Sequence, residues 1–162
     1  YEDKTIGVSN NKHKINFSNS KEFDKSLLGK AVKGAIKNIV IDGLSPSVIS
    51  VNSSAADSTY ALDTQIPIQL YFSEPVLVTG TPQLTLEAGF DDAIVDYSSG
   101  SGGNVLTFIY TVRSSDNSLD LEYHNTNTLS YNGGTILDSA GNNALLTMPA
   151  VGSGNSLSDN ST

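Results

Sequence analysis

The sequence predicts an all-β fold, an antiparallel β-sandwich of about seven strands, and two observations lead to this prediction. The first is the stretch of residues 65–75, QIPIQLYFSEP, in which alternate positions hold Ile66, Ile68, Leu70 and Phe72. A strand turns successive side chains to opposite faces, so this alternation makes one apolar face and one polar face. The second is that later segments repeat the design, each of them short, alternating and followed by Gly, Pro, Asn or Asp. Seven or eight such strands in roughly 115 residues are typical of a sandwich or a barrel.

The predicted strands follow one another along the chain after residue 46. They are residues 48–52, 65–73, 83–87, 93–97, 104–112, 119–123, 128–131 and 144–148. The pattern is strongest in residues 104–112, where two threonines take the face opposite to Leu106, Phe108, Tyr110 and Val112. Pro67 conflicts with a regular strand, because proline has no N–H to donate to a ladder. We therefore expect the second strand to enter the sheet irregularly.

The chain divides into three predicted segments. Residues 1–41 are a polar, lysine-rich leader or the end of a preceding module, residues 42–46 are a linker, and residues 47–160 are the β domain. The charge changes at the same boundary, since all eight lysines precede it and thirteen carboxylates follow it with Arg113 as the sole basic partner. Apolar spacings of three and four favour a short helix within residues 20–39, although its two glycines each weaken a helix by about 1 kcal/mol relative to alanine.

The composition argues against several classes of protein. An acidic β domain repels phosphate backbones, so we expect no nucleic-acid partner. No apolar run approaches the roughly 20 residues of a membrane-spanning helix, so no membrane span is expected. The absence of cysteine excludes disulfides and Cys-ligated zinc. Charged residues make up only 16% of the chain, while Ser, Thr, Asn and Gly are plentiful, and this surface predicts an extracellular protein, secreted or on the cell surface.

Five short phrases in the predicted β domain carry a family resemblance. They are YFSEPV at 71–76, VTGTPQLTL at 78–86, LTFIYTV at 106–112, GGTI at 133–136 and DSAGN at 138–142. On these phrases, residues 47–160 resemble the bacterial immunoglobulin-like repeats of large secreted or cell-surface proteins of the adhesin type. The resemblance implies an immunoglobulin-like sandwich in a tandem array, with neighbouring repeats of the same chain and a cell-surface or glycan ligand as partners. Several related families bind calcium at loops or between domains.

Acidic residues in predicted loops are the candidate metal ligands. Antiparallel strands deliver successive loops to alternate ends of a sandwich, so one end should carry Asp42, Glu74, Asp138 and the amide oxygen of Asn142. The opposite end should collect the remaining loop aspartates, which are Asp57, Asp63, Asp91, Asp92, Asp116 and Asp120. Calcium takes six to eight oxygen ligands, and three carboxylates would form a nucleus for such a site. Two alternatives stay open: DSAGN is good turn chemistry without any ion, and the acids could simply keep the surface soluble.

The sequence contains few residues that are candidates for catalysis. The two histidines, His13 and His124, are not accompanied by a nucleophile-elbow pattern. Paired carboxylates would suffice for glycoside cleavage, but the chain has no Trp to form a sugar platform. The sequence thus predicts a non-enzymatic extracellular spacer or adhesion repeat, rigidified by calcium. The alternative function is a carbohydrate- or other ligand-binding accessory domain of an extracellular enzyme, and a third is an enzyme built on paired carboxylates.

Overall fold

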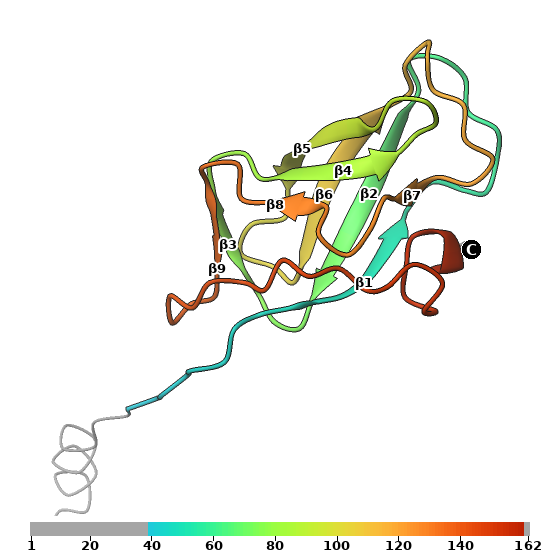
Figure 1. The fold of residues 1–162 in the computed structure, drawn as a ribbon. Helices are drawn as coiled ribbons and strands as arrows, with labels where there is room; N and C mark the ends of the chain where they lie inside the picture. The colour runs from blue at the N-terminus through green and yellow to red at the C-terminus, as the bar shows by residue number, and fades with distance from the viewer. Residues whose placement is uncertain (1–38, 161–162) are drawn as a thin grey trace, which may run out of the picture. The chain divides into compact units, whose positions relative to one another are not determined.

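The computed structural model describes residues 39–160 (Figure 1). The chain divides into two units, Tyr1–Val40 and Ile41–Thr162, and the second contains every strand discussed below. The short helix predicted within residues 20–39 falls almost wholly outside the described residues. The β unit therefore has to be understood by itself.

In its described part, up to residue 160, the β unit contains nine strands of two to eight residues. They are β1 (Val48–Ser53), β2 (Gln65–Phe72), β3 (Leu77–Thr79), β4 (Gln83–Glu87), β5 (Ala93–Ser99), β6 (Val105–Thr111), β7 (Glu122–Tyr123), β8 (Leu129–Ser130) and β9 (Thr135–Leu137). The larger sheet has the order β1-β2-β6-β5-β4-β7 with β8 also paired to β4, and β3 and β9 form a second sheet. All these strand pairs are antiparallel. Within residues 39–160 the one helical element is a 3₁₀ turn, η1 (Ser158–Asn160), so the all-β prediction is confirmed.

The larger sheet curls because β5 changes partner along its length. Its first residues, from Ala93 to Asp96, pair with β4, whereas Tyr97 and Ser99 pair with β6 and have a register shift between them. Such an irregularity bends the strand and increases its local twist. As a result β4 and β8 cross in front of β6 (Figure 1). The apolar faces of the two halves of the sheet then enclose one core.

The predicted inward faces form this core. In β2 the alternating apolar positions are all buried, and in β6 Leu106, Phe108 and Tyr110 are buried while Thr107 is half-buried. Leu84 and Leu86 of β4 are fully buried in the same cluster from the other half of the sheet. Burial of apolar surface is worth about 25 cal/mol per Å², so this cluster is the main favourable term for the fold.

Pro67 does not disturb β2, contrary to our expectation. The pairing of β2 with β6 runs without a shift from Gln65 onward and includes Pro67 opposite Ile109. The carbonyl of Pro67 accepts a hydrogen bond of 2.8 Å from the Ser53 hydroxyl, so the proline's polar edge faces β1 where β1 ends. Its missing N–H therefore costs no ladder bond, and the irregular-entry prediction is wrong.

Two other strand predictions are corrected, and two strands were not predicted. Residues 144–148 show alternating burial, but they pair through a single isolated bridge, Leu145 with Ser47, and form no strand. The predicted strand at 119–123 shrinks to β7, and Leu119 is fully exposed. Strands β3 and β9 were missed because each has only three residues, too few for alternation to be recognised.

The C-terminal segment covers the outer edge of β1. The Val51 amide donates to the Asn155 carbonyl at 3.0 Å, and the Asn160 side chain donates to the Val51 carbonyl at 2.9 Å. Buried Glu122 holds the same segment by accepting hydrogen bonds from the backbone amides of Leu157 and Ser158. An uncovered edge strand invites pairing with other chains, and this segment blocks part of that edge.

Candidate metal centre

Three of the predicted ligands meet where β2 ends at Phe72. Asp42 lies in the predicted linker, Glu74 in the β2–β3 loop and Asp138 directly after β9, and their nearest carboxylate oxygens lie within 4.8 Å of one another. Local hydrogen bonds fix this junction, because the Ser47 amide donates to the Ser73 hydroxyl at 3.1 Å and the Ser73 amide donates to the Ser47 carbonyl at 2.9 Å. The strand-parity argument, by which antiparallel strands deliver successive loops to alternate ends of the domain, therefore placed these three acids correctly.

Asp138 organises the turn that follows β9. Its Oδ1 accepts hydrogen bonds of 2.8 Å from the backbone amides of Ala140 and Asn142, and Gly141 takes a positive φ of 94° in the same turn. The side chain is buried, which raises its pKa, but the hydrogen bonds from Asn142, Gly141 and Ala140 prevail and leave the pKa below its usual value. The turn chemistry predicted for DSAGN is thus present.

Asn142 lies beside this group in a different role from the one predicted. Its side-chain nitrogen donates to Asp138 Oδ2 at 2.7 Å and to the Asp42 carbonyl at 3.3 Å. The amide therefore presents N–H groups to the acidic residues, whereas a calcium ligand would present its oxygen. In this arrangement Asn142 links the linker to the Asp138 turn.

Glu74 is the member of the group whose ionised form is disfavoured by its surroundings. Desolvation raises its pKa above the ordinary value, and the negative charges of Asp42 and Asp138 raise it further. Arg113 is the only Lys or Arg in residues 39–160, and it lies at the other end of β2 and β6. The donor set consists of hard carboxylate oxygens on three separate segments, which fits a divalent cation such as calcium.

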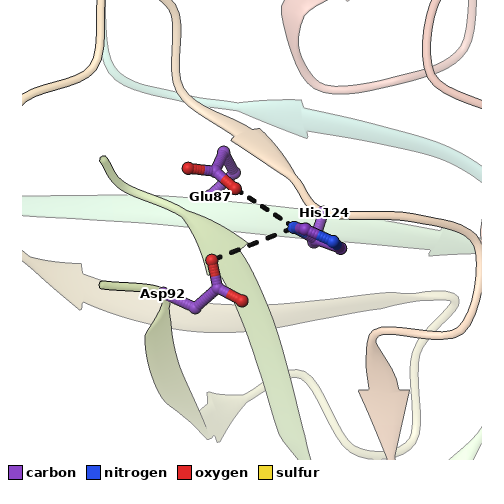
Figure 2. A group of neighbouring side chains, drawn as sticks. All are labelled: Glu87, Asp92 and His124. Carbon is purple, nitrogen blue, oxygen red and sulfur yellow. Dashed lines mark hydrogen bonds and ion pairs between the residues drawn. The ribbon is translucent and has the colours of Figure 1, made fainter. Parts of the chain in front are cut away.

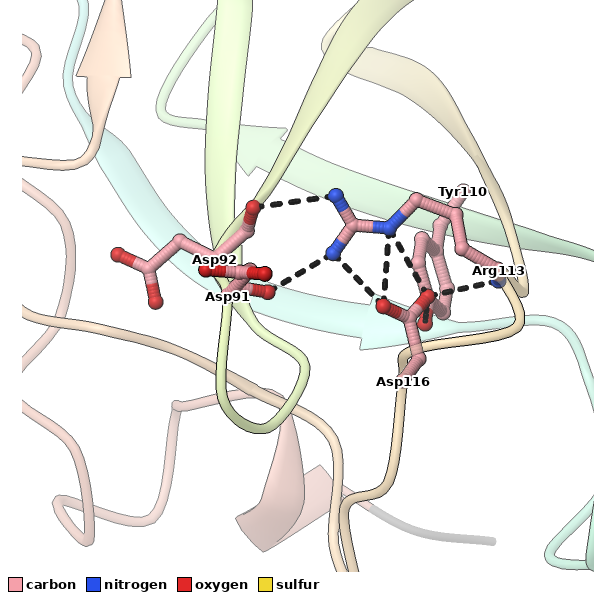
Figure 3. Close-up of polar contacts among 5 residues, drawn as sticks. All are labelled: Asp91, Asp92, Tyr110, Arg113 and Asp116. Carbon is pink, nitrogen blue, oxygen red and sulfur yellow. Dashed lines mark hydrogen bonds and ion pairs between the residues drawn. The ribbon is translucent and has the colours of Figure 1, made fainter.

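Asp116, at the opposite end, is held by a cation of the protein itself (Figure 3). The Arg113 guanidinium contacts its carboxylate at 2.7 Å, and the Tyr110 hydroxyl donates to Oδ2 at 2.6 Å. Burial acts to raise the pKa of Asp116, but the hydrogen bonds from Arg113 and Tyr110 lower it below its usual value. Burial and the neighbouring carboxylate raise the pKa of Tyr110, which stays a hydrogen-bond donor. Arg113 thus supplies the positive charge beside Asp116, which belongs to neither metal-type group of residues 39–160.

Asp57 and Asp120, the other two predicted ligands, line a cleft with Asp116. The cleft has a volume of about 630 Å³ and lies between the segments 52–60 and 116–121. Ile66, Ile68, Ala88 and Tyr110 also line it. Asp57 and Asp120 are exposed and belong to neither of the two metal-type groups found in residues 39–160. The structure therefore brings these aspartates to one cleft, but they form no group of three possible metal ligands there.

Sequence reasoning missed a second group, formed by Glu87, Asp92 and His124 (Figure 2). His124 appeared in the sequence as an isolated histidine after a predicted strand. Only the pairing of β4 with β7, which sets Glu87 opposite Glu122, brings His124 next to Glu87. A pairing of only two residues in each strand leaves no recognisable pattern in the sequence. The proximity of these three side chains is therefore visible only in the structure.

Comparison with known proteins adds no relative. No family model, no curated protein and no solved structure matches the chain. Among the described residues, no helix is long and apolar enough to cross a membrane.

Proposed function

We propose that the β unit is a non-catalytic extracellular module of the immunoglobulin-like type, one repeat of a larger surface or secreted protein, in which calcium fixes the entry linker to the domain. The observation that carries the proposal is the convergence of Asp42, Glu74 and Asp138 within 4.8 Å. The fold supports it through its antiparallel strands, its curled sheet and its single core. As a spacer or adhesion repeat, the module would contact neighbouring repeats and a cell-surface or glycan ligand.

The position of the group gives the cation a mechanical role. Asp42 belongs to the entry linker, whereas Glu74 and Asp138 belong to loops of the domain body. The linker is already attached there, because Pro46 is fully buried and its carbonyl accepts a 2.7 Å hydrogen bond from the Leu145 amide. A cation bound by all three carboxylates would extend this attachment to Asp42 and restrict the angle at which the preceding segment enters.

The chemistry of the group favours calcium over other cations. All three side chains offer carboxylate oxygens, and the carbonyl of Asp42 lies close by, next to Asn142. Calcium accepts irregular oxygen cages, whereas magnesium requires near-ideal octahedral geometry and loses its water reluctantly. Extracellular modules bind calcium with dissociation constants of about 10⁻⁴–10⁻³ M, which suits a site with one exposed and two more protected ligands.

A thermal melt of the full chain tests the proposal. Measurements are made in chelator, in magnesium and in calcium at constant ionic strength. At ten times the dissociation constant, one site contributes RT ln(1 + [L]/Kd), or roughly 1.4 kcal/mol, which should raise the Tm by several degrees. Magnesium should raise it less.

Two matched variants locate the effect. Glu74→Gln removes a ligand and one negative charge, and it should abolish the calcium shift. Asp57→Asn removes the same charge from an exposed loop outside the group, and it should keep the shift. A calcium shift that survives Glu74→Gln, or no shift in the unmodified chain, would exclude calcium at this junction.

A second candidate function rests on the cleft between residues 52–60 and 116–121. Its volume of about 630 Å³ is in the range of small-molecule sites, which span roughly 300–1,000 Å³. Apolar residues such as Ile66 and polar residues such as Asn52 and Asp120 line it together, as expected for a carbohydrate or similar ligand of an accessory domain. A glycan array at millimolar calcium separates the two functions, because a pure spacer should retain no glycan, and Asp120→Ala should reduce any binding in the cleft.

A further inference from the structure

Glu87, Asp92 and His124 converge from three different segments (Figure 2). Glu87 is the last residue of β4, Asp92 lies in the β4–β5 loop, and His124 follows β7. His124 Nδ1 lies 3.1 Å from Glu87 Oε2 and 3.9 Å from Asp92 Oδ1, and all three ligand atoms lie within 4.8 Å of one another. The side chains are 42–55% exposed, so the group is open to ions from solution.

The supporting structure holds this group in place. Glu87 is held at the end of β4, because it pairs with Glu122 of β7 and the preceding residue, Leu86, pairs with Ala93 of β5. The β4–β5 loop is fixed by Arg113, which donates to the Asp91 carbonyl at 2.8 Å and to the Asp92 carbonyl at 3.2 Å (Figure 3). At the start of the loop, the Asn117 amide donates to the Ala88 carbonyl at 2.9 Å. The loop therefore presents the Asp92 carboxylate to His124 from a fixed backbone.

Arg113 does not neutralise the carboxylates of this group. Its guanidinium bonds to the Asp116 carboxylate and to two backbone carbonyls, including that of Asp92, and no contact joins it to the carboxylate of Asp92 or Glu87. Arg113 is the only Lys or Arg in residues 39–160. The two carboxylates thus lie beside the His124 nitrogen without a Lys or Arg of the described β unit in contact with them.

We propose that Glu87, Asp92 and His124 form a binding site for a borderline divalent metal ion of the Zn²⁺ type. Imidazole nitrogen and carboxylate oxygen are the donors that Zn²⁺ takes at about 2.0–2.2 Å. Two ligands of one tetrahedral ion then lie roughly 3.4 Å apart, and the His124 distances of 3.1 and 3.9 Å bracket that separation. Three protein ligands leave the fourth position of the ion open to water or to a donor from another molecule.

This site differs from the calcium group in place and in chemistry. The register of β2 with β6 and of β4 with β5 sets Glu87 and Asp92 at the Gln65 end of the sheet, whereas Glu74 follows the Phe72 end. The site formed by Glu87, Asp92 and His124 contains a nitrogen ligand, and an imidazole nitrogen favours zinc and transition metals over calcium. The two sites can therefore be loaded and tested separately.

Calorimetric titration of the full chain with Zn²⁺, in excess calcium, tests the proposal. The sharpest variant is His124→Gln, which keeps a polar side chain beside Glu87 but removes the imidazole ligand. It should weaken the site by roughly tenfold or more, because even the loss of an outer-shell partner of a ligand lowers metal affinity by about 10–100-fold. Glu87→Gln should weaken it as well. The matched control is His13→Gln, which removes the chain's other histidine and should leave the site unchanged.

Imidazole nitrogen NMR gives a second, direct measurement. Zn²⁺ should shift the Nδ1 resonance of His124, while calcium should not. Circular dichroism of His124→Gln should match the unmodified chain, because the side chain is exposed. If His124→Gln binds Zn²⁺ as tightly as the unmodified chain, or if His13→Gln loses the site instead, the proposal is wrong. Failure of the calcium melt would leave this result untouched.

Discussion

The two ends of the β unit collect carboxylates by the same topology but hold them differently. At the Gln65 end, Asp116 meets Arg113 at 2.7 Å and Tyr110 at 2.6 Å, and hydrogen bonds lower its pKa. At the Phe72 end, Asp138 has backbone and amide donors, but Glu74 faces two other acids and its pKa is raised. The difference shows that a cluster of carboxylates indicates a metal site only where no hydrogen-bond donor or basic side chain of the protein compensates the negative charge.

The comparison also separates structural acids from candidate ligands. Asp116 and Asp138 are each bound to several N–H donors and help to build their loops. Glu74 has no such donor among the hydrogen bonds of the described residues, and its neighbours disfavour its charge. A bound cation would stabilise the folded state most where the protein provides the fewest N–H donors and positive charges to its carboxylates. This is why we propose calcium at the Phe72 end and attribute the lowered pKa of Asp116 to hydrogen bonds that include those from Arg113.

The largest expected effect comes from substituting the core between the two ends, and it tests whether both ends unfold as one cooperative unit. Phe108 is fully buried in β6, so Phe108→Ala should lower the free energy of unfolding by about 3–5 kcal/mol. Thr107→Ala, on the other face of the same strand, should cost far less. Chemical denaturation followed by signals from both ends checks this. If Phe108→Ala melts one end and spares the other, or if the two variants cost the same, the single-core description fails.

The second effect concerns the Gln65 end alone. Arg113→Met should cost about 1.5 kcal/mol, the low end for hydrogen bonds to a charged group, because the arginine side chain is 41% exposed. The pKa of Asp116 is lowered in the folded state, so its contribution is present above the ordinary value of 3.8 and is lost as the pH falls through the folded pKa. Arg113→Met should therefore move acid unfolding to higher pH.

Two further variants sharpen the Arg113 result. Arg113→Lys keeps the charge but loses the planar donor group that reaches Asp116 and two carbonyls at once, so it should restore only part of the stability. Asp116→Asn combined with Arg113→Met completes a double-mutant cycle. A coupling energy near zero in that cycle would mean that Arg113 acts on the β4–β5 loop and contributes nothing through Asp116.

The sequence predicted most of the fold because burial in this domain follows strict alternation. The predicted bounds of β4 agree with the structure, and those of β1, β2 and β6 differ by at most one residue at either end. The inward faces of β2 and β6 were predicted from the same pattern. Prediction failed for the three-residue strands β3 and β9, because so short a segment makes no period, whereas the two-residue strands β7 and β8 lie within longer predicted strands. It also failed at residues 144–148, whose alternation arises from packing without a ladder.

The candidate sites were predictable to the extent that topology alone sets them. Strand parity was sufficient to bring Asp42, Glu74 and Asp138 together, since it depends only on which end each loop occupies. Parity gives no information about side-chain partners, so it could not show that Arg113 takes Asp116 or that Asn142 presents its nitrogen. The neighbourhood of His124 depends on the register of β4 with β7, which no local pattern encodes.

The smallest expected effect concerns Glu74 in the absence of divalent cations. Its pKa is raised in the folded protein, so the associated stability is present below the ordinary value of 4.5 and is lost as the pH rises through the folded pKa. In chelator at neutral pH, Glu74→Gln should therefore melt slightly higher than the unmodified chain, because it removes the charge that Asp42 and Asp138 repel. The gain should vanish in acid, where Glu74 is protonated in both states, and it should shrink in high salt. In calcium the order should reverse, since the unmodified chain gains a ligand interaction that the variant lacks. Asp57→Asn, an equal change of charge on an exposed loop, should show neither the gain nor the reversal. A variant that melts lower than the unmodified chain in chelator would mean that Glu74 stabilises the junction by itself, and the contrast between the two ends would disappear.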